Sequence, residues 1–428
     1  MRQLYTALLY LATPLILARL AWSGLRNRGY WRRWPERFGW APGTPADDGI
    51  WVHAVSVGEV IAALPLIDRL RGAYPGVQVT VTTMTPTGSE RVRAALGDDV
   101  HHVYLPYDLP GAVRRFLDAV RPRLGLLMET ELWPNLVAGC ASRGIPLVLA
   151  NARLSAASAA GYRRVGGLVR ALLGDLAAVA AQADADARRF VELGAAPERV
   201  VVTGSIKFDL QVDGGVVAAG RMLREELGAA RPCWIAASTH DGEDEQVLDA
   251  HARIVARCPR ALLQLVPRHP ERFARVAALC ASRGFSVARR SRDEPGREAG
   301  VYLGDTMGEL LTLYAAADVA FVGGSLVPTG GHNPLEPAAL GVPVIAGPHM
   351  HNFARIGELL ERDGALRTVA DVDGLTDEVL AWLEDPGRAA EAGAAGRRVV
   401  ERNRGALERL LAIVGAVLDG RVPAGAGD

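Results

Sequence analysis

Short apolar strands alternate with helical stretches from residue 50 onward, and the series runs twice. Candidate strands of the first series lie at 50–55, 77–82, 124–128, 147–150, 177–181 and 200–203. Those of the second lie at 234–237, 261–266, 285–288, 319–322 and 342–346. Helical patterns fill the intervals, for example at 59–71 and 112–120. Alternation of this kind predicts an α/β protein with two Rossmann-like, doubly wound parallel sheets.

The break between the two series falls in the glycine-containing stretch 208–231, and 428 residues suffice for two domains of ordinary size. We therefore expect a first domain at 31–213 and a second at 214–420, with a disordered tail at 422–428. Ligands of open α/β sheets bind beyond the carboxyl ends of the strands. The two domains are thus expected to face a cleft, and each loop that follows a strand is a candidate site.

Composition narrows the class of function. The chain carries 48 basic and 48 acidic residues, so no global field attracts nucleic acid and none is expected as a partner. The four cysteines form no CxxC pair, and no His/Asp/Glu spacing compels a metal, so neither a metal nor another cofactor is expected. The acidic run 241–245 is interpreted as a solvated helix start. Lys207 is the one lysine in the chain, which marks it for attention.

The amino-terminal segment is apolar from residue 4 to 22 except for Arg19, and arginines cluster at 26–37. A cleaved signal peptide, a membrane span, an interfacial anchor and a structural helix are all compatible with its length. We interpret 1–30 as a membrane anchor with a basic juxtamembrane segment. The arginine excess after it favours a cytoplasmic location for the remainder.

A glycine-rich loop joins the candidate strand at 319–322 to a short helix. Two glycine pairs, at 323–324 and 330–331, precede a helix start at Asn333 and Pro334, with Glu336 in the first turn. Backbone N–H groups of such loops and helix starts bind anions, and a carboxylate one turn later can reach ribose hydroxyls. The loop therefore predicts a nucleotide-phosphate site, although its match to the dinucleotide fingerprint is poor.

Carboxylates gather at strand ends of the first series. Glu59 follows Ser56 and Gly58 at the start of a helix, where it acts either as a general base or as a dipole-stabilising residue. Its helix position lowers its pKa, whereas desolvation would raise it. Glu129 and Glu131 follow the next central strand, and Lys207 ends the series, where it could neutralise a carboxylate or phosphate.

Two further loops follow strands of the second series. Arg268 and His269 stand between two prolines, and a guanidinium fork suits a phosphate. Met307, Gly308 and Glu309 open a helix whose backbone could contact a base or ribose.

Seven segments together resemble the family of 3-deoxy-D-manno-octulosonic acid (Kdo) transferases. They are the amino-terminal anchor, HAVSVGEV at 53–60, METELWPN at 128–135, NARLS at 151–155, TGSIKFD at 203–209, PRHPERF at 267–273 and GGHNPLEPAALGVPV at 330–344. The resemblance covers nearly the whole chain.

The resemblance implies a GT-B fold and metal-independent, inverting transfer of Kdo from CMP-Kdo to a lipid A precursor (lipid IVA), at the cytoplasmic face of the inner membrane. It makes Glu59 the general base, with Glu129 and Lys207 supporting the transition state. It assigns the CMP pocket to the residues Arg268, His269, Met307, Gly308, Glu309, Asn333, Pro334, Leu335 and Glu336. Ser56, Gly58 and Glu131 are candidates on the acceptor side.

Two other functions compete with this interpretation. One is a different GT-B enzyme, such as a glycosyltransferase or epimerase that uses a UDP-sugar, which should carry a site for two phosphates. The other is a membrane-tethered nucleotide-binding protein without catalysis, which predicts a missing base, whereas Glu59 is present.

Overall fold

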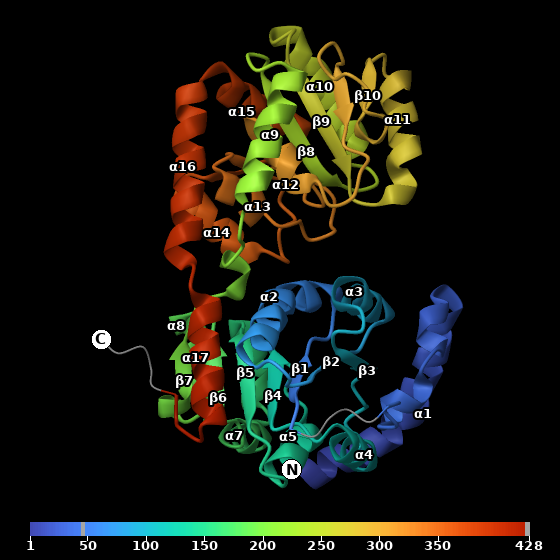
Figure 1. Cartoon of the computed structure of the whole chain (residues 1–428), viewed down its shortest axis with the longest axis vertical. Helices are drawn as coiled ribbons and strands as arrows, with labels where there is room; N and C mark the ends of the chain where they lie inside the picture. Colours follow the sequence, from blue (N-terminus) through green and yellow to red (C-terminus); the bar gives the residue numbers. More distant parts are fainter. Residues whose placement is uncertain (44–47, 424–428) are drawn as a thin grey trace. The chain divides into compact units, whose positions relative to one another are not determined.

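A computed structural model describes residues 1–43 and 48–423, so the end of the tail expected to be disordered, 424–428, lies outside the described residues. The chain divides into two compact units (Figure 1). The first comprises Met1–Lys207 together with Arg404–Asp428, and the second comprises Phe208–Asn403.

The first unit is built on a seven-stranded sheet in the order β3-β2-β1-β4-β5-β6-β7, and all neighbouring strands are parallel. The strands are β1 (Ile50–His53), β2 (Val79–Thr83), β3 (His101–Tyr104), β4 (Leu124–Met128), β5 (Leu147–Ala152), β6 (Ala178–Ala181) and β7 (Val200–Val202). The helices are α1 (Arg2–Arg26), α2 (Val57–Ala73), α3 (Pro86–Leu96), α4 (Pro110–Val120), α5 (Pro134–Ala141), α6 (Ala156–Arg163), α7 (Gly166–Gly174), α8 (Asp184–Glu192) and α17 (Ala406–Leu418). Short 3₁₀ turns lie at Arg28–Trp31 (η1), Trp34–Phe38 (η2), Pro197–Arg199 (η3) and Ile206–Phe208 (η4).

Both faces of this sheet are covered, which explains its continuous apolar strands. Ile50 and Val52 point into a core shared with α2, α3 and α17. Trp51, between them, points to the opposite face, into a core with α4, α5, α7 and α8. Alternate residues of one strand thus serve two cores, as the pleat requires.

The second unit repeats the plan with the order β10-β11-β9-β8-β12-β13-β14, again parallel throughout. Its strands are β8 (Cys233–Thr239), β9 (Leu262–Pro267), β10 (Val287–Arg289), β11 (Val301–Leu303), β12 (Val319–Val322), β13 (Val344–Ala346) and β14 (Leu366–Thr368). Its helices are α9 (Gly214–Leu227), α10 (Asp244–Arg257), α11 (Phe273–Ser282), α12 (Leu310–Ala315), α13 (Leu335–Leu340), α14 (Ala354–Arg362), α15 (Val372–Glu384) and α16 (Pro386–Asn403). The remaining 3₁₀ turns are Pro270–Arg272 (η5) and Arg290–Arg292 (η6).

The predicted fold class, two doubly wound parallel sheets with an apolar amino-terminal helix, is confirmed. Three strands escaped prediction, namely β3, β11 and β14. Two of them, β3 and β14, form edges of their sheets, and β11 and β14 span three residues each. Strands of three or four residues give only a short hydrophobic run, so their signal in the sequence is weak.

The units also divide differently from the expected domains. The first unit ends at Lys207, before the boundary placed near 213, and the chain returns to it at Arg404. The end of the chain forms two helices, because Gly405 adopts a left-handed φ of 90° between α16 and α17. Leu407, Leu410 and Val414 of α17 are buried in the first unit's core, not in the second domain expected to reach 420.

Each strand order contains one point where the connections reverse direction. In the first sheet this switch lies between β1 and β4, and in the second between β8 and β12. Loops that leave neighbouring strands at a switch diverge to opposite faces and leave a crevice at the carboxyl ends. These two places are therefore where a ligand is expected to bind.

Candidate active site

Glu59 lies at the first switch, in the turn that joins β1 to α2. Ser56 caps the helix: its hydroxyl oxygen accepts from the Glu59 N–H at 3.4 Å and donates to Glu59 Oε1 at 3.0 Å. Glu59 Oε2 accepts from the N–H of Val55 at 2.9 Å. The carboxylate thus folds back over the helix start in a reciprocal cap of the Ser-x-x-Glu type. Gly58, between them, is exposed and adds no side chain.

Burial raises the pKa of Glu59 and outweighs the hydrogen bonds from Val55 and Ser56, which lower it; the nearby Glu129 carboxylate raises it further. Of the two effects expected at this position, desolvation, which raises the pKa, is therefore larger than the effect of the helix start, which lowers it. A carboxylate with a raised pKa takes up a proton more readily, which suits a general base.

Glu129 and Lys207 lie together beyond β4. Glu129 directly follows β4, the neighbour of β1, and its φ of 57° is left-handed. Lys207 Nζ lies 3.5 Å from Glu129 Oε1, and Arg153 Nη2 lies 3.9 Å from Oε2. Such backbone conformations cost a non-glycine residue about 1–3 kcal/mol and concentrate at functional sites. The strain here turns the carboxylate toward two cations.

Glu131 completes a cluster of three carboxylates at the first switch. Trp133 Nε1 donates to its Oε2 at 3.1 Å. Burial, together with the charges of Glu59 and Glu129, raises the pKa of Glu131 to about 7, against the hydrogen bond from Trp133, which lowers it. The charge of Glu129 acts on Glu59, and the charges of Glu59 and Glu129 act on Glu131, so the three side chains lie in one neighbourhood.

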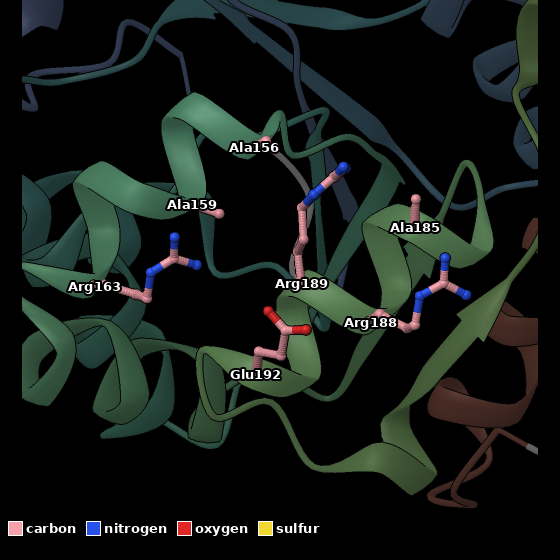
Figure 2. A pocket seen from close by; sticks show the side chains of 7 residues that line it. All are labelled: Ala156, Ala159, Arg163, Ala185, Arg188, Arg189 and Glu192. Atoms are coloured by element: carbon pink, nitrogen blue, oxygen red, sulfur yellow. The ribbon is translucent and has the colours of Figure 1, made fainter.

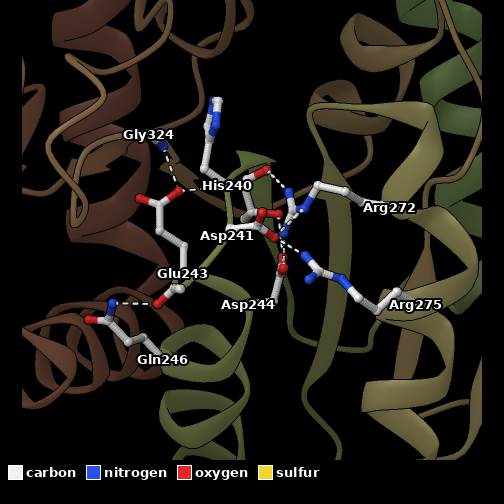
Figure 3. A network of polar contacts seen from close by, with 10 residues as sticks. His240, Asp241, Glu243, Asp244, Gln246, Arg272, Arg275 and Gly324 are labelled. Atoms are coloured by element: carbon white, nitrogen blue, oxygen red, sulfur yellow. Dashed lines mark hydrogen bonds and ion pairs between the residues drawn. The ribbon is translucent and has the colours of Figure 1, made fainter. Parts of the chain in front are cut away.

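The backbone N–H groups of the glycine-rich loop bind the carboxylate of Glu243, a residue of the same unit. Glu243 Oε2 accepts from the N–H groups of Gly324 at 2.6 Å and His240 at 2.9 Å. Its Oε1 accepts from Ser325 and Leu326, each at 2.9 Å. Figure 3 shows the carboxylate between Gly324 and His240. The amides of Gly324, Ser325 and Leu326 are therefore not available to a phosphate, because an internal carboxylate already satisfies them. The rest of the predicted site, from Gly330 to Glu336, stays a prediction.

The expectation that 241–245 is a solvated helix start is also wrong for two of its residues. Glu243 is 0% exposed and Asp244 is 2% exposed. Asp244 Oδ1 accepts from Thr239 at 2.7 Å, and its other oxygen pairs with Arg272, which also holds Asp241 at 3.0 Å (Figure 3). This network fixes the turn that follows β8.

Cationic and imidazole side chains gather at the second switch. The Nε2 atoms of His240 and His332 lie 2.8 Å apart with their rings stacked, and the rings of His240 and His269 meet edge to face. Burial lowers the pKa of His332 to about 4, with His240 and Arg268 adding to the effect. Sequence reasoning missed His240 and His332. The signal was available, since both lie in loops that follow strands.

Arg268 is half-buried beside this group, with its N–H donating to Thr239 O at 3.0 Å. Its guanidinium makes no hydrogen bond or ion pair within the described ranges 1–43 and 48–423. It interacts electrostatically with His240, His332 and Glu336. Burial raises the pKa of Glu336, and Asn333 Nδ2 donates to its carboxylate at 3.2 Å.

The other nucleotide-pocket candidates differ in what they can offer. Glu309 is held by Arg290 at 2.9 Å and by Thr306 at 2.5 Å, so its carboxylate is occupied. Next to it, Met307 is 64% exposed and Gly308 has a left-handed φ of 86°. Pro334 and Leu335 are buried, and only their backbone can face a ligand.

A separate polar pocket of about 260 Å³ lies between α6 and α8 of the first unit (Figure 2). It is lined by Ala156, Ala159, Arg163, Ala185, Arg188, Arg189 and Glu192. None of the residues singled out from the sequence lines it. Within the described part of the chain, no group of three or more His, Cys, Asp and Glu side chains is arranged to hold a metal ion.

Comparison with known proteins decides the family. Residues 32–210 match the family model described as 3-deoxy-D-manno-octulosonic-acid transferase (kdotransferase). The chain is 45% identical to the 3-deoxy-D-manno-octulosonic acid transferase of Haemophilus influenzae, over 98% of this chain and 100% of that one. It belongs to the Kdo transferase family. The transferase of Bordetella pertussis is also similar, at 40% identity over 96% of this chain and 98% of the relative.

Membership of the Kdo transferase family confirms the resemblance drawn from the motifs and makes the chain a glycosyltransferase. A solved structure of UDP-GlcNAc 2-epimerase from Neisseria meningitidis has a TM-score of 0.57 and 12% identity, covering 87% of this chain and 100% of that one. At that identity the likeness concerns the fold alone, which is GT-B-like. The roles of the individual site residues stay predictions.

Proposed function

We propose that this Kdo transferase family member moves Kdo from CMP-Kdo to a lipid A precursor, lipid IVA, with inversion at the anomeric carbon. The full-length similarity to curated Kdo transferases supports the donor and acceptor classes. The observation that carries the chemistry is the desolvated carboxylate of Glu59 at the β1–β4 switch, with a raised pKa and with Glu129 and Lys207 nearby.

Glu59 acts as the general base. Its carboxylate accepts the proton of an acceptor sugar hydroxyl, and that oxygen attacks the anomeric carbon of Kdo from the face opposite CMP. A bond from the acceptor oxygen forms as the bond to the CMP phosphate oxygen breaks, and its electron pair leaves with CMP. The Val55 N–H, the Ser56 hydroxyl and the Ser56 N–H donate to the Glu59 carboxylate, which has about four acceptor positions, so one remains for the incoming hydroxyl.

Arg268 stabilises the leaving group. Negative charge grows on the phosphate as the bond breaks, and a guanidinium without a protein hydrogen-bond partner in the described chain can bind it. The imidazoles of His240, His269 and His332 lie with Arg268 and supply further donors. The one phosphate of a CMP-sugar needs one guanidinium, whereas a UDP-sugar has two phosphates to hold. Arg268 therefore favours a CMP-sugar over the UDP-sugar alternative.

The acceptor is a membrane lipid, so we also propose that residues 1–30 hold the enzyme on the cytoplasmic face of the inner membrane. The supporting feature is α1, whose residues Arg2–Leu25 have a mean hydropathy of 1.6 and few buried positions. Basic residues after it favour that side.

The test is transfer from freshly generated CMP-Kdo to tetra-acylated lipid A precursor, followed by mass spectrometry. Wild type is expected to add one or more Kdo masses. Glu59→Gln and Glu59→Ala should be folded and slower by about 10²–10⁴-fold, the usual worth of a general base. Glu90→Gln, an exposed glutamate on α3, is the matched control and should keep full activity.

Two outcomes would contradict the proposal in different ways. Absence of transfer by wild type, with donor and acceptor shown to be competent, would reject the reaction, and turnover of a UDP-sugar would then establish the alternative. An active Glu59→Gln variant would keep the reaction but remove Glu59 as its base.

A further inference from the structure

Helix α1 divides lengthwise into two halves. Exposed apolar side chains follow one another at helical spacing along one side, and they are Leu4, Leu8, Leu11, Leu15, Trp22 and Leu25. We call these six residues the apolar stripe. Positions on the opposite side, such as 5, 9, 12, 16 and 20, are half-buried or buried. A helix that crosses a bilayer alone meets lipid on all sides, whereas this one presents a single side.

The beginning of α1 is attached to the globular part of the first unit. The Tyr5 hydroxyl donates to the Asp108 carboxylate, and Thr6 Oγ1 donates to Asn135 Oδ1 at 3.0 Å. Asp108 also accepts from the N–H groups of Asn135 at 2.9 Å and Leu136 at 2.7 Å. Tyr5 and Thr6 thus join the polar network that caps α5.

The chain that follows α1 is attached to the same unit. A Cβ placed on Gly29 would lie 2.8 Å from Cβ of Pro86, so η1 touches the start of α3. Arg33 donates to Ser89 Oγ at 3.1 Å and to His102 O at 2.7 Å. Both ends of the helix are therefore tied to one water-facing body.

These attachments conflict with a membrane span. At about 1.5 Å per residue, α1 is long enough to cross a hydrocarbon core of about 30 Å. Crossing would place Tyr5 and Arg33 on opposite sides of the bilayer, and one set of contacts would have to break. If the Tyr5 contact broke, the buried carboxylate of Asp108 would lose a hydrogen bond, which costs free energy.

We propose that α1 lies in the plane of the membrane, with the apolar stripe buried among lipids and its other side kept on the first unit. The occupant of the stripe is a phospholipid surface with anionic headgroups, because the exposed Arg19, Arg28 and Arg32 lie beside or just beyond it. Trp22 and Trp31, 62% and 48% exposed, are the aromatic type that favours the interface. This inference rests on the proposed membrane association, and on no other part of the proposed function.

Cysteine accessibility in the full-length enzyme tests the topology. Gln3→Cys is exposed at the edge of the helix, and Ser142→Cys is a control on the surface of the globular part. Each is treated with a membrane-impermeant maleimide in cells with a permeabilised outer membrane and in inverted inner-membrane vesicles. Wild type, with its four native cysteines, gives the background, and a periplasmic cysteine marker verifies access.

The in-plane arrangement predicts that Gln3→Cys behaves as Ser142→Cys does, labelled in inverted vesicles and not from the periplasm. Labelling of Gln3→Cys from the periplasmic side would overturn the proposal. Protection from both sides until detergent is added would overturn it too, because residue 3 would then lie within the bilayer.

Charge placed on the stripe tests the lipid contact. Leu11→Glu with Leu15→Glu should reduce binding to vesicles containing anionic lipid by about tenfold or more. Met222→Glu, an equally exposed apolar position on α9, is the matched control and should bind normally. Unchanged vesicle binding by the double variant would show that the apolar stripe does not contact lipid. Transfer to detergent-dispersed acceptor should survive in the released variant. Absence of transfer in wild type as well would count against the proposed reaction and leave the topology untouched.

Discussion

The two units use the same topology and gather different titratable side chains at their switch points. At the β1–β4 switch the first unit gathers the carboxylates of Glu59, Glu129 and Glu131. At the β8–β12 switch the second unit gathers Arg268 and a set of imidazoles. A general base needs a carboxylate that can take up a proton, whereas a group that holds a phosphate needs a cation. The fold supplies the position, and a few side chains decide the chemistry.

A second contrast lies between two glutamates at helix starts. Glu59 accepts hydrogen bonds from Val55 and Ser56 and keeps a free acceptor position, and its environment raises its pKa. Glu243 accepts four N–H groups and is 0% exposed. An ionised carboxylate has about four acceptor positions. Glu243 is thus saturated and structural, whereas Glu59 can still receive a proton.

Glu243→Gln should have the largest effect on stability. A carboxamide can accept with one oxygen only, and its NH₂ group would oppose two of the four backbone N–H donors. We expect a loss of about 3–5 kcal/mol in the free energy of unfolding, measured with urea. Glu245→Gln, exposed two residues later, is the matched control and should be nearly neutral. A loss below about 1 kcal/mol would show that the loop does not depend on this carboxylate.

Arg268→Ala should have the next largest effect, on the donor alone. Loss of a charged hydrogen-bonding partner of the phosphate costs about 1.5–3 kcal/mol, which corresponds to roughly 10–100-fold in kcat/KM for the CMP-sugar. The KM for the lipid acceptor should not change. Arg275→Ala, with a 64% exposed side chain on α11, controls for lost surface charge. A change in the KM for the lipid acceptor alone would show that Arg268 binds the acceptor and not the CMP-sugar.

Glu131→Gln should change how the free energy of unfolding depends on pH. The folded-state pKa of Glu131 is about 7, above its usual 4.5, so the folded protein holds this proton more tightly than the unfolded chain does. The contribution of Glu131 to stability therefore falls as pH rises from about 4.5 to 7. Discounted for partial exposure, removal of the charge should stabilise the protein by about 1–2 kcal/mol at pH 8. The gain should vanish near pH 4.5.

Urea unfolding of wild type, Glu131→Gln and the exposed control Glu198→Gln at both pH values measures this effect. An equal stability difference at the two pH values would show that Glu131 titrates normally.

The sequence predicted the first switch well because its residues lie close to strand ends. Leu124–Met128 was located to the residue, and Glu129, which follows it, lies 3.5 Å from Lys207. Position after a strand is a local property, and in a parallel sheet it fixes the edge on which a side chain lies.

The second switch was predicted less well, because its decisive contact is not local. Glu243 reaches the amides of Gly324 to Leu326 across some eighty positions of sequence, and no pattern within either segment signals that pairing. An acidic run is usually solvated, and burial of Glu243 became evident only with the fold. The return of α17 to the first unit is non-local in the same way.

Ser56→Ala has the smallest expected effect. It distinguishes the role of Ser56 as the cap of α2 from its role as a hydrogen-bond donor to Glu59. Its hydroxyl caps α2 and also donates to Glu59, so its removal should cost about 1 kcal/mol of stability and alter transfer. Ser155 caps α6 in the same way, accepting from Ser158 N at 3.0 Å, and Ser155→Ala should cost as much stability without changing transfer. The Ser56 hydrogen bond lowers the pKa of Glu59, so the acidic limb of the pH–rate profile should shift upward in Ser56→Ala alone. Identical profiles for the two serine variants would show that Ser56 only caps its helix, and that the pKa of Glu59 is set without it.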